Sequence, residues 1–123
     1  MSKSRDTAIA YWAAAEARDW DAFGALLTED VVYELPQTGE RILGRARYLQ
    51  FNVEYPGDWH VTIERALGDG DHAATWTRFA VNGGEQPALT FFDLTPEGLI
   101  ARVTDFWPYP YEPPPGREHL VER

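Results

Sequence analysis

Residues 59–107 divide into four apolar segments of strand length, separated by three turns. The turns, at 68–71, 82–84 and 96–98, are built mainly from Gly, Asp, Asn and Pro. In the first segment, apolar and polar residues alternate from Trp59 to Leu67, which is the period of a strand with one buried face. Turns at this spacing predict that the four strands pair as an antiparallel meander.

The first third of the chain is predicted to be mainly helical. Asp6 or Thr7 is expected to cap a helix whose apolar stripe runs over residues 9–15. Asp19 or Asp21 then offers a cap for a short second helix that buries its Phe and Leu residues.

Two strands and a third helix are predicted between these helices and the meander. Residues 31–35 are rich in β-branched and aromatic side chains and stop at Pro36, which indicates a strand. Residues 41–43 form its short partner, and residues 45–54 have helical spacing through a stripe of Ala46, Leu49 and Val53. Helices followed by a long antiparallel run predict an α+β fold, with the helices packed on one face of the sheet.

A chain of 123 residues has the length of one domain. We place this domain at residues 1–108 and treat residues 109–123 as a Pro-rich tail, which must be extended or polyproline-like. The tail carries Tyr109 and Tyr111, which need apolar contacts. We therefore expect the tail to pack on its own domain or on a dimer partner.

Charge and composition limit the classes of partner. Eleven basic against twenty acidic residues give a formal charge of −9, which argues against nucleic acid and anionic membrane surfaces. A neutral or cationic small molecule is the expected partner. The chain has no cysteine, and its start has no apolar stretch typical of a signal peptide. We therefore expect a cytoplasmic protein.

Asp105 is the residue that most strongly indicates function. Side chains on a strand alternate between faces, so Asp105 shares one face with Val103 and Trp107. A carboxylate on a buried face costs several kcal/mol unless it is paired or neutralised. Asp105 is therefore either a general acid/base with a raised pKa or a structural group paired with Arg78, Arg102 or a Tyr hydroxyl.

The order of these elements resembles the SnoaL-like branch of the nuclear transport factor 2-like superfamily. The resemblance covers residues 5–108 and rests on 18–22, 26–34, Gly44, 69–71 and 99–107. It implies a curved antiparallel sheet wrapped by N-terminal helices into a cone, a cystatin-like α+β barrel with an internal pocket. It also implies a small hydrophobic ligand, no cofactor, and a homodimer formed through the outer sheet face.

The resemblance carries over to single residues unevenly. Asp105-Phe106-Trp107 matches the Asp-aromatic-aromatic motif that supplies a pocket Asp in SnoaL-like cyclases and limonene-epoxide hydrolases. The Arg-x-Asp pair of the hydrolases falls on Thr77 and Phe79, which we expect to line the pocket without that chemistry. The base of ketosteroid isomerases falls on Leu35, so that base is missing as well.

The remaining predicted site residues surround Asp105. Either Tyr33 or Glu34 is expected to face the pocket from the first strand, and a bulge could exchange them. Tyr33 would hydrogen-bond a ligand oxygen, whereas Glu34 is either a second pocket carboxylate or a solvated side chain. Trp12 and Trp107 are predicted to hold the ligand, and Val103 to line the same wall. The three histidines are scattered, so no metal site is predicted.

Two hypotheses follow from these residues. In the first, the protein performs cofactor-free general acid/base chemistry (isomerisation, cyclisation or hydrolysis) on a small hydrophobic carbonyl or cyclic compound, with Asp105 and Tyr33 as catalytic residues. In the second, it is a non-catalytic protein that binds a small hydrophobic ligand, or a dimeric accessory protein of the same fold. The missing hydrolase pair and isomerase base favour the second.

Overall fold

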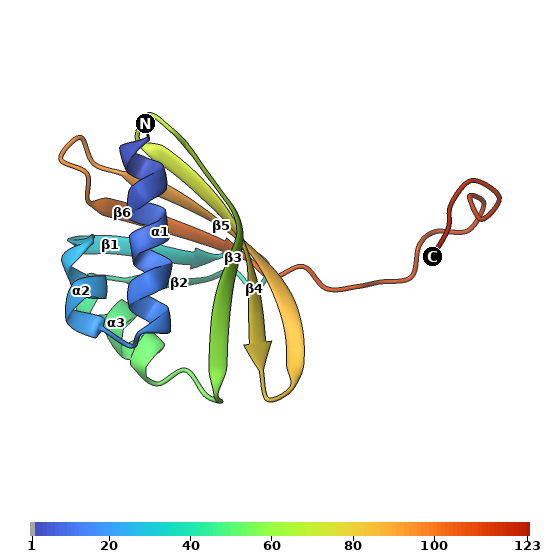
Figure 1. Ribbon diagram of the computed structural model, residues 1–123, viewed down its shortest axis with the longest axis horizontal. Helices are drawn as coiled ribbons and strands as arrows, with labels where there is room; N and C mark the ends of the chain where they lie inside the picture. Colours follow the sequence, from blue (N-terminus) through green and yellow to red (C-terminus); the bar gives the residue numbers. More distant parts are fainter. Residues whose placement is uncertain (1) are drawn as a thin grey trace.

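Helices and strands follow the predicted order in the structure, a computed structural model that describes residues 2–123 (Figure 1). In chain order the elements are α1 (Lys3–Glu16), α2 (Trp20–Ala25), β1 (Leu27–Leu35), β2 (Glu40–Leu43), α3 (Arg45–Val53), β3 (Trp59–Asp69), β4 (His72–Val81), β5 (Gly84–Leu94) and β6 (Ile100–Phe106). The predicted α+β class is therefore confirmed.

The described strands form one curved sheet with the order β2-β1-β6-β5-β4-β3. Strands β3 to β6 pair antiparallel with their sequence neighbours, as the meander prediction requires. The pairing of β1 with β6 is parallel, so the sheet is not wholly antiparallel. The edges β2 and β3 do not pair, and the sheet stays open instead of closing into a barrel.

The helices cover the concave face of the sheet and bury its aromatic side chains (Figure 1). Helix α1 lies against β3 and β4, and α3 lies against β1. Gly68 permits a close approach of β3 to the start of α1, because a Cβ at this position would lie 2.1 Å from Oγ of Ser2. Asn82 and Gly83 have φ values of 50° and 86°, as a tight turn between β4 and β5 requires.

Helix α1 begins earlier than predicted. Its N-cap is Ser2, whose Oγ accepts a hydrogen bond of 3.1 Å from the backbone N–H of Arg5. Asp6 and Thr7, the predicted caps, lie inside the helix, where Thr7 donates to the carbonyl of Lys3. The predicted cap of α2 is correct, because Asp19 accepts from the backbone N–H of Ala22.

Of the predicted apolar stripe of helix α3, only Leu49 packs against the core. Ala46 and Val53 are exposed, whereas Tyr48 is completely buried and stacks on other aromatic rings. The prediction counted aliphatic residues only. The residues that face inward are Tyr48 and Phe51, which are also one helical turn apart.

Strand β3 loses its alternation halfway along. Its register with β4 shifts between Ile63 and Arg65, which is a β-bulge. Beyond the bulge, Ala66 takes the inward position, and Leu67 is 59% exposed instead of buried as its spacing predicts. The bulge therefore places an apolar side chain on the outer face of the sheet.

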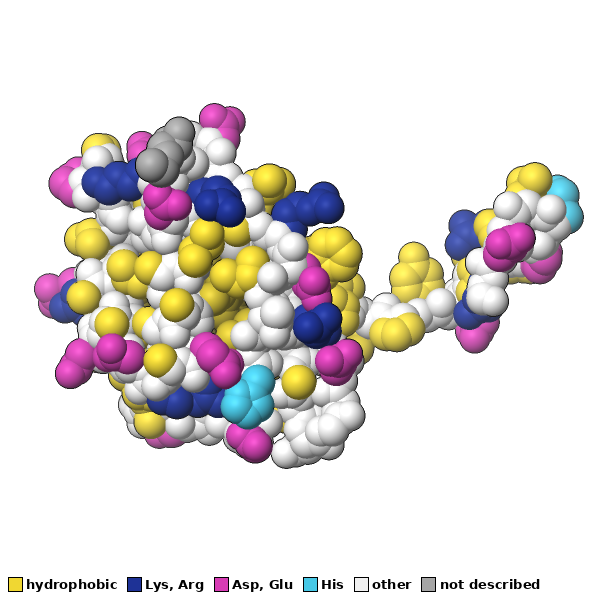
Figure 2. All heavy atoms as spheres, viewed as in Figure 1, with side chains coloured by type: hydrophobic (Ala, Val, Ile, Leu, Met, Phe, Trp, Pro, Cys, Tyr) yellow, Lys and Arg dark blue, Asp and Glu magenta, His cyan; other side chains and the backbone are white. Residues whose placement is uncertain are grey.

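The Pro-rich tail leaves the domain after β6 and runs away from it (Figure 1). Tyr109 and Tyr111 are 68% and 83% exposed, and hydrophobic side chains lie along the tail in Figure 2. Tyr109, at the start of the tail, lines a space together with Tyr55 and Trp107 of the domain, and packing of the tail on its own domain or on a dimer partner stays a prediction. Within residues 2–123, no helix is long and apolar enough to cross a membrane.

Candidate active site

Asp105 lies on the concave face of β6 and is 3% exposed. Its carboxylate accepts three hydrogen bonds from neighbouring side chains. Thr90 on β5 donates to Oδ1 at 2.7 Å, while Tyr33 on β1 and Nε1 of Trp107 donate to Oδ2 at 2.6 and 3.2 Å. The strand pairing brings these donors together, because Thr90 lies opposite Asp105 in the β5–β6 register. Of the structural pairings considered for Asp105, the Tyr hydroxyl is the one that forms.

Burial raises the pKa of Asp105 above its ordinary value, because a charged carboxylate loses its hydration inside the protein. The hydrogen bonds from Tyr33, Thr90 and Trp107 oppose this effect, since they stabilise the charged form. Desolvation is the larger cause, so the carboxyl group holds its proton to a higher pH than a solvated Asp does.

Three tyrosines extend the polar cluster toward the helices. The ring of Tyr48 on α3 stacks on that of Tyr33, with centroids 4.5 Å apart. The hydroxyls of Tyr48 and Tyr11 are hydrogen-bonded to each other. Burial raises the pKa of Tyr11, Tyr33 and Tyr48, and the charge of Asp105 adds to this rise. All three hydroxyls therefore stay protonated and available as hydrogen-bond donors at neutral pH.

Asp105 opens onto a small internal space, the deep cavity. About 30 Å³ of it is open to the centres of water molecules. It is lined by Tyr11, Trp12, Ala15, Tyr33, Tyr48, Phe51, Asn52, Tyr55, Trp59, Phe79, Asp105 and Trp107. Asp105 carries the one carboxyl group of this lining, and nine of the twelve residues are aromatic.

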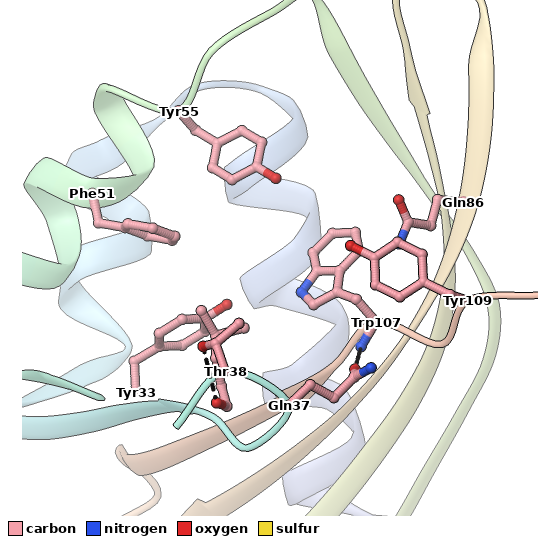
Figure 3. Close-up of a pocket in the computed structure, with 9 residues that line it drawn as sticks. Tyr33, Gln37, Thr38, Phe51, Tyr55, Gln86, Trp107 and Tyr109 are labelled. Atoms are coloured by element: carbon pink, nitrogen blue, oxygen red, sulfur yellow. Dashed lines mark hydrogen bonds between the residues drawn. The ribbon is translucent and has the colours of Figure 1, made fainter. Parts of the chain in front are cut away.

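A larger space, the mouth cavity, adjoins the deep cavity and has about 210 Å³ open to the centres of water molecules. Tyr33, Phe51, Tyr55 and Trp107 line both spaces, and Figure 3 shows their rings around a common volume. Gln37 fixes one side of the mouth, because its Oε1 accepts a hydrogen bond from the backbone N–H of Trp107. These four aromatic side chains therefore form a wall common to the two cavities.

Tyr33, and not Glu34, faces the interior from β1. Tyr33 is 3% exposed, whereas Glu34 points to the outer face of the sheet and forms an ion pair with Arg102. The two residues are neighbours on a regular part of the strand, so they alternate without a bulge between them. The placement of Glu34 in the ligand pocket is therefore wrong for this structure.

The other predicted ligand contacts divide into two groups. Trp12, Phe79 and Trp107 line the deep cavity, and Nε1 of Trp12 donates to Thr75 at 2.9 Å. Thr77 and Val103 are completely buried and belong to neither of the two cavity linings. Both side chains face the interior as predicted but are covered by other residues, so neither borders the cavities.

Arg78 lies on the outer face of β4, as expected from alternation with Thr77. It forms ion pairs with Glu64 and Glu85, at 2.6 and 3.5 Å. Because Arg102 is paired with Glu34, neither arginine considered as a counter-ion of Asp105 takes that role. Among the ion pairs of residues 2–123, none includes Asp105.

Sequence reasoning missed Tyr48, Thr90 and the hydroxyl of Tyr11. A signal for Tyr48 was present, because Tyr48, Phe51 and Tyr55 recur at the spacing of one helix face. Thr90 could have been found only from the β5–β6 register, which depends on the whole hairpin. Within the described chain, no group of three His, Cys, Asp or Glu side chains converges to hold a metal ion.

Residues 8–107 match the model of the SnoaL-like domain. The chain belongs to the SnoaL-like family. A proposed ketosteroid isomerase from Kribbella flavida DSM 17836 shares 53% identity with this SnoaL-like chain, with a TM-score of 0.95 over 98% of it and 89% of the other chain. A proposed polyketide cyclase from Pseudomonas putida KT2440 shares 31% identity, with a TM-score of 0.71 over 88% and 92%.

A Mycobacterium tuberculosis protein solved with estradiol-17β-hemisuccinate shares the fold of the SnoaL-like chain. Its identity is 21% and its TM-score 0.75, over 88% of this chain and 95% of that one. No curated protein sequence matches the chain. The family is therefore established, and its relatives have several different assigned activities.

Proposed function

We propose that the protein performs cofactor-free general acid/base chemistry on a small hydrophobic carbonyl or cyclic compound. The observation that supports this reaction class is the position of Asp105, which is buried, holds its proton unusually firmly and opens onto the deep cavity. A carboxyl group in such a site gives or takes a proton near neutral pH more readily than a solvated Asp. Isomerisation, cyclisation and hydrolysis all need such a proton transfer.

Each neighbour of Asp105 has a role in this proposal. Tyr33 lines both cavities with its hydroxyl 2.6 Å from Asp105, so its single O–H can turn from Asp105 to a substrate oxygen beside the carboxyl group. Trp12 and Trp107 hold the substrate between apolar surfaces. The small size of the deep cavity limits what reaches Asp105 to one compact group, while the rest of the substrate occupies the mouth cavity.

Exchange of hydrogen for deuterium tests the proposal without knowledge of the natural substrate. Small cyclic ketones are incubated with the protein in D₂O, and the loss of α-hydrogens is followed by NMR. Removal of an α-proton by Asp105 and return of a deuteron converts C–H into C–D. Asp105→Asn should lower the rate by about 10²–10⁴ fold, which is the usual contribution of one positioned acid or base. Asp93→Asn, on the exposed surface of β5, is the matched control and should exchange at the wild-type rate.

One observation favours a second candidate, a non-catalytic ligand-binding protein. Leu35, at the position of the isomerase base, lines the mouth cavity as an apolar residue. Asp105 is the one carboxylate in the two cavity linings, so no second acid is placed to share the chemistry. Ketones that bind in the cavity but exchange no faster than in buffer would support this candidate and contradict the first.

For its assembly, we propose a homodimer formed through the outer face of the sheet. This face exposes Leu67, Trp76, Leu89 and Phe91 to between 40% and 59%. Exposed large apolar side chains clustered on one face are typical of interaction sites. A partner on this face would also offer a surface to the extended Pro-rich tail. A cytoplasmic location likewise stays a prediction.

A further inference from the structure

The carboxylate of Asp105 is rich in hydrogen bonds but has no positive charge beside it. Tyr33, Thr90 and Trp107 all donate to it, and the indole N–H of Trp107 can only donate. The lining of the deep cavity contains no Lys, Arg or His. When Asp105 ionises, its negative charge is therefore solvated by dipoles and left without a counter-charge, which is costly in an apolar interior.

Aromatic rings supply most of the surface around this charge. Nine of the twelve residues that line the deep cavity are Phe, Tyr or Trp. The faces of such rings carry negative electrostatic potential and attract cations, most strongly for Trp. Trp12, Trp59 and Trp107 contribute three indole rings to the lining, and Phe79 lies between them with centroids 4.8 to 5.9 Å from each. One face of Trp59 already carries the guanidinium of Arg18, 3.5 Å from the ring centroid, so Trp12 and Trp107 are the indoles that remain for a ligand cation. The cavity thus has the composition of an aromatic cage with an acid at its base.

The size and hydrogen bonding of the cavity select one kind of cation. The centres of water molecules can occupy a volume of about 30 Å³ in the deep cavity. With the water radius of about 1.4 Å added, the space holds a rounded group of roughly 3 Å radius, about the size of a tetramethylammonium ion. Three of the four lone-pair positions of Asp105 are already used. A fully alkylated ammonium has no N–H to satisfy, so it needs only the charge of Asp105 and the ring faces, and it uses none of the polar groups of the lining.

We propose that the deep cavity binds small, fully alkylated ammonium ions, with ionised Asp105 as the counter-charge and the aromatic rings as the cage. The formal charge of −9 favours the approach of such cations. The four aromatic residues shared with the mouth cavity form a wall common to the two cavities. This inference goes beyond the proposed reaction, because it requires the cavity and the charge but no proton transfer.

Calorimetric titration of the full chain with tetramethylammonium chloride tests the inference, at a pH above the measured pKa of Asp105 and at constant ionic strength. The neutral probe is tert-butanol, which has a similar shape and no charge. The cation should bind at least tenfold more tightly than tert-butanol. Asp105→Asn should weaken cation binding at least tenfold and leave the weak binding of tert-butanol within twofold.

Asp93→Asn is the matched control, because it removes the same charge from an exposed position on β5. Its affinity for the cation should stay within twofold of the wild type. Equal affinity for the cation and tert-butanol, or equal cation affinity in wild type and Asp105→Asn, would overturn the inference. The ketone exchange assay is read separately, so failure of the proposed reaction does not decide this result.

A titration of the wild type with pH covers the case in which Asp105→Asn does not fold. Protons and cations compete for Asp105, so the affinity for tetramethylammonium should fall at least tenfold as the pH is lowered through the pKa of Asp105. The other titratable groups that face the cavity are Tyr11, Tyr33, Tyr48 and Tyr55, and burial raises the pKa of each. They stay neutral over this range. Affinity that is constant from pH 8 to the acid limit of folding would contradict the inference.

Discussion

The hydroxyl of Tyr33 donates a hydrogen bond of 2.6 Å to the carboxylate of Asp105, which lies 72 positions later in the chain. The parallel pairing of β1 with β6 makes this contact possible, because it places the first strand beside the last. Tyr33 thereby stabilises the charged form of Asp105 against the desolvation that raises its pKa. The bond links the fold of the sheet directly to the acidity of the site.

Tyr33→Phe removes this hydrogen bond and keeps the ring that stacks on Tyr48. We expect the pKa of Asp105 to rise further and the free energy of unfolding to fall by about 1–2 kcal/mol, as for a buried hydrogen bond to a carboxyl group. Chemical denaturation and NMR titration measure the two effects. Tyr55→Phe is the control, because the hydroxyl of Tyr55 has no hydrogen-bond partner in residues 2–123, and it should change neither quantity appreciably.

Burial of Asp105 should make stability depend on pH in a defined direction. Its pKa is raised in the folded state, so its contribution to stability is fully present below the ordinary Asp pKa of about 3.9 and is lost as the pH rises through the folded pKa. Asp105→Asn lacks this titration. The stability of the variant relative to the wild type should therefore increase as the pH rises from about 4. If the stability of Asp105→Asn relative to the wild type stayed constant or decreased with pH, burial would not be the dominant influence on the pKa of Asp105.

Glu16 and His60 join the end of α1 to the start of β3. The carboxylate of Glu16 lies 2.9 Å from Nδ1 of His60 and accepts a hydrogen bond of 2.8 Å from the backbone N–H of Val61. The hydrogen bond to Glu16 raises the pKa of His60. Desolvation raises the pKa of Glu16, but the hydrogen bonds from His60 and Val61 outweigh it, so the pKa of Glu16 is lowered overall.

Glu16→Gln should therefore lower the pKa of His60, as measured from its ring proton shifts. The contribution of His60 to stability is present below the ordinary His pKa of about 6.5 and is lost as the pH rises through its folded pKa, so the variant should lose stability mainly at acid pH. Asp58→Asn is the matched comparison and should have a smaller effect, because Asp58 contributes less to the pKa of His60. An unchanged His60 pKa in Glu16→Gln would rule out the pair in solution.

Trp76→Glu tests the proposed dimer. A charge on the outer apolar face should weaken pairing, because its burial in the interface costs hydration that the adjacent Arg65 only partly offsets. Sedimentation should give twice the mass of the chain for the wild type and the mass of one chain for the variant. Val53→Glu introduces the same charge at an exposed position of α3 and should remain dimeric. A monomeric wild type at micromolar concentration would contradict the assembly.

The meander and the inward position of Asp105 follow from local patterns, because strand alternation and turn residues depend on few neighbours. The choice between Tyr33 and Glu34 needed the register of β1, and the bulge in β3 has no signature in the alternating residues before it. Tyr48 was missed because a helix of mixed polarity has more than one candidate face. The path of the tail could not be predicted, since a Pro-rich segment has no side-chain periodicity that fixes which surface it contacts.

The acidity of Asp105 is the most direct test of the site. The carboxyl carbon of Asp105, assigned by comparison with Asp105→Asn, can be followed by NMR over a pH titration of the ligand-free protein. We predict a midpoint clearly above the ordinary Asp pKa of about 3.9, because desolvation outweighs the three hydrogen bonds. A midpoint at or below about 3.9 would mean that the hydrogen bonds dominate and Asp105 is a permanently charged structural group, which would contradict its proposed role in proton transfer.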